Sequence, residues 1–208
     1  MFCIPLEKVF LTRPDKPDKQ YGGFVHMSVN TPKIRGLQDL LENGLKLAQI
    51  YEICVPEGEY KDHLIANIPR GFERYITICD REFVNLEVLV SYLGSLPKPI
   101  DLVILNVSEI LYLDFIKDYG VLQKSMQEFY GHLHRLANLG TTCIVFANYF
   151  YYNQIFPDII SSDIIQIQIR ESGILEYWEA IIVNPPELSG RRTLFKPFES
   201  DVPFLIQF

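Results

Sequence analysis

The chain has 208 residues, of which 48% are hydrophobic and 22% are charged, and its formal net charge is −7. This composition is ordinary for a globular domain with a sizeable core, and no apolar run approaches the ~20 residues that a membrane span needs. The acidic balance argues against a protein that grips nucleic acid alone, because such proteins usually carry a basic surface.

The N-terminal residues and the cysteines indicate an intracellular chain, in the cytoplasm or the nucleus. No basic segment followed by a long apolar stretch opens the sequence, so secretion is not expected. The four cysteines show no CxxC spacing. Three of them (Cys54, Cys79 and Cys143) lie in apolar, strand-like runs, where cysteine behaves as a small buried hydrophobe.

The first part of the chain predicts a connector and the beginning of one domain. Residues 1–22 carry prolines and mixed charges, as an exposed connector does. A single domain is expected over residues 23–208. Its first predicted strand covers 23–29, and a helix at 37–49 and a strand at 50–55 follow. Together these elements would form a βαβ unit.

Further strands and helices alternate after this unit. The polar stretch at 57–73 predicts a short helix and a loop, 74–80 a strand, and 85–96 a helix. The clearest pattern begins at Asp101, where the apolar run DLVILN is followed by an amphipathic segment and a second apolar run, TTCIVFA. Such parallel strands are buried on both faces and need no polar alternation. The helix between them places five apolar residues, spaced 4, 3, 4 and 3, on one face: Leu122, Met126, Phe129, Leu133 and Leu136.

The last part of the chain predicts antiparallel structure. IQIQIR alternates in polarity, Ser172 and Gly173 are typical of a turn, and YWEAIIV supplies a second strand. The expected fold class is therefore α/β, with a mostly parallel sheet flanked by helices and a C-terminal antiparallel hairpin. Ligands of such sheets bind at the carboxyl ends of the strands.

Three segments of the chain are ICVPEG, HLHRLANLGTTCIVFANYF and IIVNPPELSGRRTLFKPFESDV, and in this order they resemble the ATPase core of the RecA/RadA recombinase superfamily. HLHRLANLGTTCIVFANYF is similar to the helix and strand that lead to the family's DNA-contacting second loop. ICVPEG resembles the strand that carries the family's Asp-Thr-Glu-Gly, and IIVNPPELSGRRTLFKPFESDV resembles its closing segment. The resemblance covers roughly residues 23–202 and implies a RecA-like core.

The departures from the family pattern concern ATP. A phosphate-binding loop needs GxxxxGK[ST], because glycine amides hold the phosphates and the lysine reaches the outer oxygens. In the loop SVNTPKIRG, Lys33 is followed by Ile34 and preceded by Pro32. Asn106 stands where the family has a metal-supporting aspartate, whereas Glu57 matches its water-activating glutamate. The resemblance therefore implies a degenerate paralog that does not hydrolyse ATP and needs no cofactor.

Each candidate residue also has a plainer interpretation. Lys33 and Arg35 could contact an anion at a helix N-terminus, or form a solvated basic loop. Glu57 could complete a partner's ATP site or be an ordinary loop residue. No metal site is expected, because His132 and His134 lie two residues apart on a helix and face different sides.

Two segments are candidates for contact with nucleic acid. Tyr149, Tyr151 and Tyr152 occupy the position of the family's DNA-contacting loop and could stack on unpaired bases. Basic residues are absent between Ala147 and Ile169, however, so a protein contact is favoured there. The second candidate is a basic patch that could meet phosphate or simply be solvated; it comprises Arg191, Arg192 and Lys196.

The resemblance implies a non-catalytic subunit that pairs with another RecA-fold protein or recombinase and assists homologous recombination. DNA would then be reached through the complex, and no membrane is involved. One alternative is a RecA-fold scaffold for RNA or protein in an assembly outside repair. The other is an ATPase whose unusual nucleotide site is built from Lys33 and Glu57.

Overall fold

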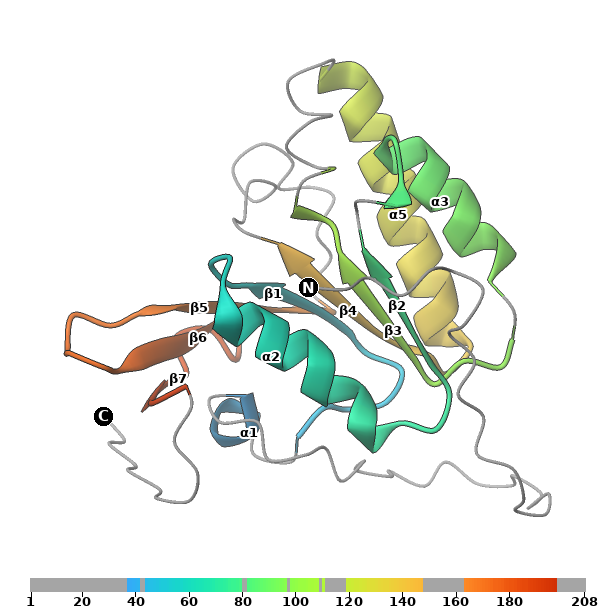
Figure 1. Ribbon diagram of the computed structural model, residues 1–208. Helices are drawn as coiled ribbons and strands as arrows, with labels where there is room; N and C mark the ends of the chain where they lie inside the picture. The colour runs from blue at the N-terminus through green and yellow to red at the C-terminus, as the bar shows by residue number, and fades with distance from the viewer. Residues whose placement is uncertain are drawn as a thin grey trace, which may run out of the picture.

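The computed structural model describes residues 37–41, 44–79, 82–96, 98–108, 110, 119–147 and 163–197. Seven strands of this part form one sheet in the order β2-β3-β4-β1-β5-β6-β7 (Figure 1). The strands are β1 (Ile50–Cys54), β2 (Tyr75–Cys79), β3 (Leu102–Asn106), β4 (Thr142–Ala147), β5 (Ile164–Glu171), β6 (Trp178–Asn184) and β7 (Arg192–Phe195). The helices are α1 (Leu37–Leu40), α2 (Glu59–Asn67), the 3-10 turn η2 (Ile68–Gly71), α3 (Leu86–Ser95) and α5 (Tyr119–Asn138).

The sheet is parallel from β2 to β5 and antiparallel from β5 to β7. Strand β1 lies in the middle, with β4 on one side and β5 on the other. Every residue of β1 and β4 is buried. The predicted fold class is confirmed: the sheet is mostly parallel, and its C-terminal strands form the antiparallel hairpin.

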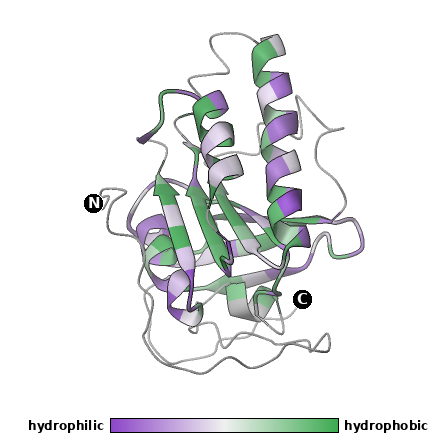
Figure 2. Cartoon of the chain, turned by 90° about the vertical axis from the view of Figure 1, so that its right-hand side faces the viewer, coloured by the Kyte–Doolittle hydropathy of each residue, from purple (hydrophilic) through white to green (hydrophobic). Residues whose placement is uncertain are grey.

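Helices cover both faces of the sheet, and each face has its own apolar core. On one face α3 and α5 pack against residues of the strands such as Val103 and Cys143. On the other face α1 and α2 pack against residues such as Ile53 and Ile167. Figure 1 shows α2 on one side of the sheet and α3 with α5 on the other. In Figure 2 the strands are mainly hydrophobic, whereas the long helix α5 also carries hydrophilic residues along its length.

Local sequence explains where these elements begin. The side chain of Asn85 accepts a hydrogen bond from the backbone N–H of Val88 at 2.9 Å and so caps the start of α3. All five apolar residues predicted for one face of α5 are buried. The pattern predicted from Asp101 onward is confirmed as a βαβ unit, because β3 and β4 pair in parallel and α5 lies between them in the sequence.

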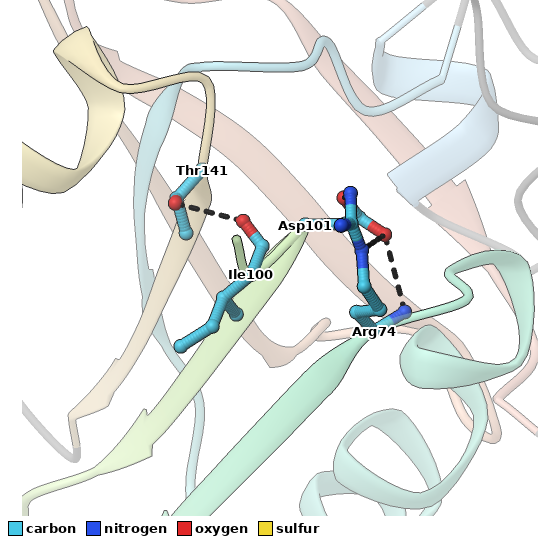
Figure 3. Close-up of polar contacts among 4 residues, drawn as sticks. All are labelled: Arg74, Ile100, Asp101 and Thr141. Carbon is cyan, nitrogen blue, oxygen red and sulfur yellow. Dashed lines mark hydrogen bonds and ion pairs between the residues drawn. The ribbon is translucent and has the colours of Figure 1, made fainter. Parts of the chain in front are cut away.

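Polar contacts join the amino ends of β2, β3 and β4 (Figure 3). The guanidinium of Arg74 donates two hydrogen bonds to the carboxylate of Asp101, from Nη2 at 2.6 Å and from Nε at 3.2 Å. The hydroxyl of Thr141 donates to the carbonyl of Ile100 at 2.9 Å. These contacts join the residues that directly precede β2, β3 and β4.

Two predictions in the first part of the chain have other outcomes. The strand expected at 23–29 lies outside the described residues. The helix expected at 37–49 is wrong in length, because the helical residues end at Leu40 and residues 44–49 form no helix. Gly44 has a φ of 75°, a left-handed conformation that ends helices. None of the described helices is long and apolar enough to cross a membrane.

Strand β1 contains a buried carboxyl group. Glu52 is fully buried, and its Oε2 accepts hydrogen bonds from Gln166 Nε2 at 2.7 Å and from the Tyr130 hydroxyl at 3.3 Å. Its Oε1 has no hydrogen-bond partner among the described residues. Burial raises the pKa of Glu52 to about 7, although the two hydrogen bonds oppose the rise.

This carboxyl group predicts a pH-dependent stability. The folded pKa lies above the unfolded value of 4.5, so the contribution of Glu52 is full below pH 4.5 and is lost as the pH rises through 7. The corresponding loss in free energy of unfolding is about 3 kcal/mol between these limits. Urea denaturation across this pH range should show a flatter profile for Glu52→Gln than for the wild type.

The matched control is Glu171→Gln, which removes an exposed carboxylate from β5. Its profile should follow that of the wild type. Parallel profiles for wild type and Glu52→Gln would show that Glu52 ionises in the folded state as readily as in the unfolded state.

Candidate functional site

Polar side chains gather where β1 and β3 end. The chain leaves β1 at Cys54, and α2 begins at Glu59, so only four residues join the strand to the helix. The ends of β1 and β3 lie on either side of β4. After β1 the chain enters α2 on one face of the sheet, and the chain that leaves β3 continues to α5 on the other face. Such a divergence of connections is where open α/β sheets bind ligands.

Lys61 is the central residue of this site. It lies in the first turn of α2, and its side chain is only 1% exposed. Its ammonium Nζ contacts Glu57 Oε1 at 2.5 Å and donates a hydrogen bond to Ser108 Oγ at 2.8 Å. The Glu57 side chain is 59% exposed. The buried cation is therefore compensated by a carboxylate that reaches it from the solvent side.

Ser108 connects Lys61 to the end of β3. Its hydroxyl donates a hydrogen bond to Asn106 Oδ1 at 3.4 Å. Asn106 is the last residue of β3 and is half-buried, as expected for a residue at the carboxyl end of a strand. The chain Glu57–Lys61–Ser108–Asn106 thus ties the loop after β1 to the loop after β3.

The start of α2 is unusual for a site that would hold an anion. Its N-cap is Gly58, with a φ of 142° and no side-chain hydrogen bond to the first turn. Glu59 and Asp62 both lie in that turn. A carboxylate there interacts favourably with the helix dipole but repels a second anion. Tyr60 is buried, with its ring 5.2 Å from that of Trp178 and 5.5 Å from that of Phe195.

The spacing after β1 is that of a phosphate-binding loop, but the residue types are not. In GxxxxGK[ST] the lysine follows six residues after the first glycine and opens the helix. Counting back from Lys61 puts Val55 and Tyr60 at the two glycine positions, and Asp62 at the hydroxyl position. Of the defined positions of this motif the chain matches only the lysine, and the Glu57 carboxylate lies beside it.

The sequence analysis placed the degenerate phosphate-binding loop at SVNTPKIRG, which is a different stretch of the chain. In the described structure the strand expected at 50–55 is β1, which lies between β4 and β5. Lys33 and Arg35 lie outside the described residues. Of the expected site residues, Glu57 and Asn106 belong to one connected set of side chains.

Lys61 and Ser108 were missed. Lys61 could have been found from its spacing, because it lies seven residues beyond the end of an apolar strand. Ser108 gives no such signal, since it meets Lys61 only through a contact between residues 47 positions apart.

The basic patch lies elsewhere on the sheet. Arg192 and Lys196 belong to or follow β7, which is separated from β1 by β5 and β6. Arg192 lies 3.8 Å from Glu179, and Lys196 lies 3.2 Å from Glu176. Arg191 is exposed. Acidic neighbours thus partly neutralise this patch.

The remaining predictions concern the aromatic segment, metal ions and the cysteines. Tyr149, Tyr151 and Tyr152 lie outside the described residues. In the described ranges no group of three histidine, cysteine or acidic side chains could hold a metal ion. Cys54, Cys79 and Cys143 are buried free thiols, as predicted.

Comparison with known proteins places the fold. No family model matches this sequence, and no match is found among curated proteins. Among solved structures, the chain is similar to the crystal structure of the RadB recombinase, with a TM-score of 0.56 and 10% sequence identity. The match covers 81% of this chain and 95% of that chain. The chain therefore has a RecA-like fold.

The contacts of Lys61 predict an ordered series of stabilities. Lys61→Ala should lower the free energy of unfolding by about 2–4 kcal/mol, because a fully buried side chain leaves a cavity. Lys61→Met keeps most of the volume and leaves Glu57 free to be hydrated, so its loss should stay below about 1.5 kcal/mol. Urea denaturation can be followed through the fluorescence of Trp178, the only tryptophan.

Lys124→Met is the control, because it removes an exposed lysine from α5. It should change the free energy of unfolding by no more than about 0.5 kcal/mol. If Lys61→Met were as damaging as Lys61→Ala, the ion pair rather than the packing of the lysine stem would be the main contribution.

Proposed function

We propose that this chain is a non-catalytic RecA-fold subunit that associates with another RecA-fold protein and assists homologous recombination. The observation that carries the proposal is the Lys61–Glu57 pair at the carboxyl end of the central strand. It stands where a RecA-fold ATPase would hold the phosphates of its nucleotide. A carboxylate at this point argues against a bound triphosphate.

Three further residues, Val55, Tyr60 and Asn106, support the proposal that this chain does not hydrolyse ATP. Val55 and Tyr60 replace glycines, and Tyr60 is packed against Trp178, so the backbone has little room to wrap a phosphate. Asn106 ends β3 without a charge to support magnesium. Phosphoryl transfer depends on positioning and charge neutralisation, and both would be poor at this site.

We infer the association with a partner because the chain has a RecA-like fold but lacks the residues expected for ATP hydrolysis. RecA-fold proteins that form rings or filaments use head-to-tail contacts, which need the shape of the domain but not its activity. The similarity to the structure of the RadB recombinase supports a partner of this kind. The net charge of −7 favours contact with DNA through the complex rather than by this chain alone.

Titration calorimetry of the purified chain with ATP and magnesium tests the first half of the proposal. We expect no heat of binding at millimolar nucleotide, because the cradle for the phosphates is missing. A RecA-fold ATPase in the same buffer is the positive control. ATP turnover that is lost in Lys61→Met would contradict the proposal and favour an enzyme with an atypical site.

Affinity purification from the native cells, with nuclease treatment, tests the second half. A recombinase or a second RecA-fold subunit should be recovered in stoichiometric amounts, as judged by mass spectrometry and sizing. Recovery of a hexameric assembly that retains RNA would instead favour the scaffold role outside repair.

A further inference from the structure

The β5–β6 hairpin extends away from α3 and α5 (Figure 1), and one of its faces lies outside the apolar core that these helices form. Ile169 and Ala180 belong to the core on the other face of the sheet. Because successive side chains of a strand point to opposite faces, their neighbours Arg170 and Glu179 lie on the face of α3 and α5. Leu194 pairs with Glu179 and shares this face. The core of α3 and α5 contains no described residue of β6 or β7, and we call this part of the sheet the open face of the hairpin.

A hollow of about 440 Å³ lies at the open face, beside the turn of the hairpin. Its wall includes Arg170, Glu179 and Leu194 from the strands and Ile174 from the turn. The Arg170 guanidinium donates two hydrogen bonds to Glu179 Oε2, from Nη2 at 2.8 Å and from Nε at 3.1 Å. Arg192 Nη1 lies 3.8 Å from the other carboxylate oxygen of Glu179. The hollow thus has charged side chains of both signs and apolar side chains in its wall.

The turn beside the hollow presents apolar side chains to solvent in a fixed conformation. Ile174 is 54% exposed and Leu175 is 88% exposed. The backbone N–H of Ser172 donates to the Tyr177 carbonyl at 2.9 Å, and the N–H of Tyr177 donates to the Ile174 carbonyl at 3.1 Å. The Ser172 hydroxyl also accepts a hydrogen bond from the Ile174 N–H at 3.1 Å. Because the turn is already ordered, little conformational entropy is lost when Leu175 contacts another protein.

The projection and the hollow are complementary to each other. An interface with twofold symmetry uses the same patch on both copies, so the patch must contain the partner of each of its own features. The hairpin offers Leu175 as an apolar projection and the hollow beside it as a receptor. The wall of the hollow holds two arginines and two glutamates: Arg170, Arg192, Glu171 and Glu179. Although the whole chain has a net charge of −7, two copies would meet here without a local excess of like charge.

We propose that the β5–β6 hairpin forms an isologous contact between two copies of this chain, in which Leu175 of each copy enters the hollow of the other. Arginine and glutamate side chains of the two hollows would then face each other and fix the register of the contact. A twofold contact closes after two copies, so it produces a dimer and no longer assembly. The proposal goes beyond the proposed function and does not depend on it, because it concerns this chain alone.

Sedimentation velocity of the full chain over a micromolar concentration range tests the contact. We expect a reversible equilibrium between monomer and dimer, with no larger species. Leu175→Ser removes the projection from an exposed position, so the circular dichroism spectrum should match that of the wild type. Because the leucine is used twice in a twofold contact, the Kd of the dimer should rise by roughly a hundredfold.

Leu139→Ser is the matched control, because Leu139 is 57% exposed and follows α5, outside the hairpin. Its Kd should equal that of the wild type. Glu171→Arg tests the charges independently of the projection. It gives the hollow three arginines and one glutamate, so like charges meet in the dimer and the Kd should also rise.

A wild type that stays monomeric at its highest soluble concentration would refute the contact and leave the proposed function untouched. An unchanged Kd in Leu175→Ser would place the dimer contact elsewhere and also refute it. Growth beyond the dimer with concentration would indicate a head-to-tail contact, which contradicts the twofold arrangement. Failure to recover a recombinase or RecA-fold partner from native cells would instead count against the proposed function alone.

Discussion

Burial of the parallel strands on both faces is the constraint on which the rest of the structure depends. Because α3 and α5 cover one face and α1 and α2 the other, nearly every side chain of β1, β3 and β4 must be apolar. Most polar side chains then gather at the ends of the strands, and Glu52 in the middle of β1 is an exception. The amino ends carry a structural pair, Arg74 with Asp101. The carboxyl ends of β1 and β3 carry the connected set around Lys61.

The Lys61 set shows how a buried cation can be accommodated at the end of a strand. A buried ammonium without a counter-charge would destabilise the domain by several kcal/mol. Replacement of the lysine is one solution, and a neighbouring carboxylate is another. In this chain Glu57 provides the carboxylate and Ser108 the second hydrogen bond.

Glu52 shows that the core is not organised for stability alone. A carboxyl group in the central strand, with one oxygen lacking a described hydrogen-bond partner, is unfavourable at neutral pH. Its contacts with Gln166 and Tyr130 nevertheless join β1, β5 and α5 across one face of the sheet. Buried polar contacts of this kind favour one arrangement of the packed elements over others, at a cost in stability.

The sequence by itself determined the elements whose signals are local. Apolar runs, the 3.6-residue periodicity of α5 and the turn of the C-terminal hairpin are all confirmed, because each depends on residues close together in the chain. Only the tertiary structure decided which strand is central, since strand order depends on pairing between distant segments. It likewise decided that Lys61 meets Ser108, and that the helix predicted from residue 37 ends before Gly44, where the local conformation overrides the apolar pattern.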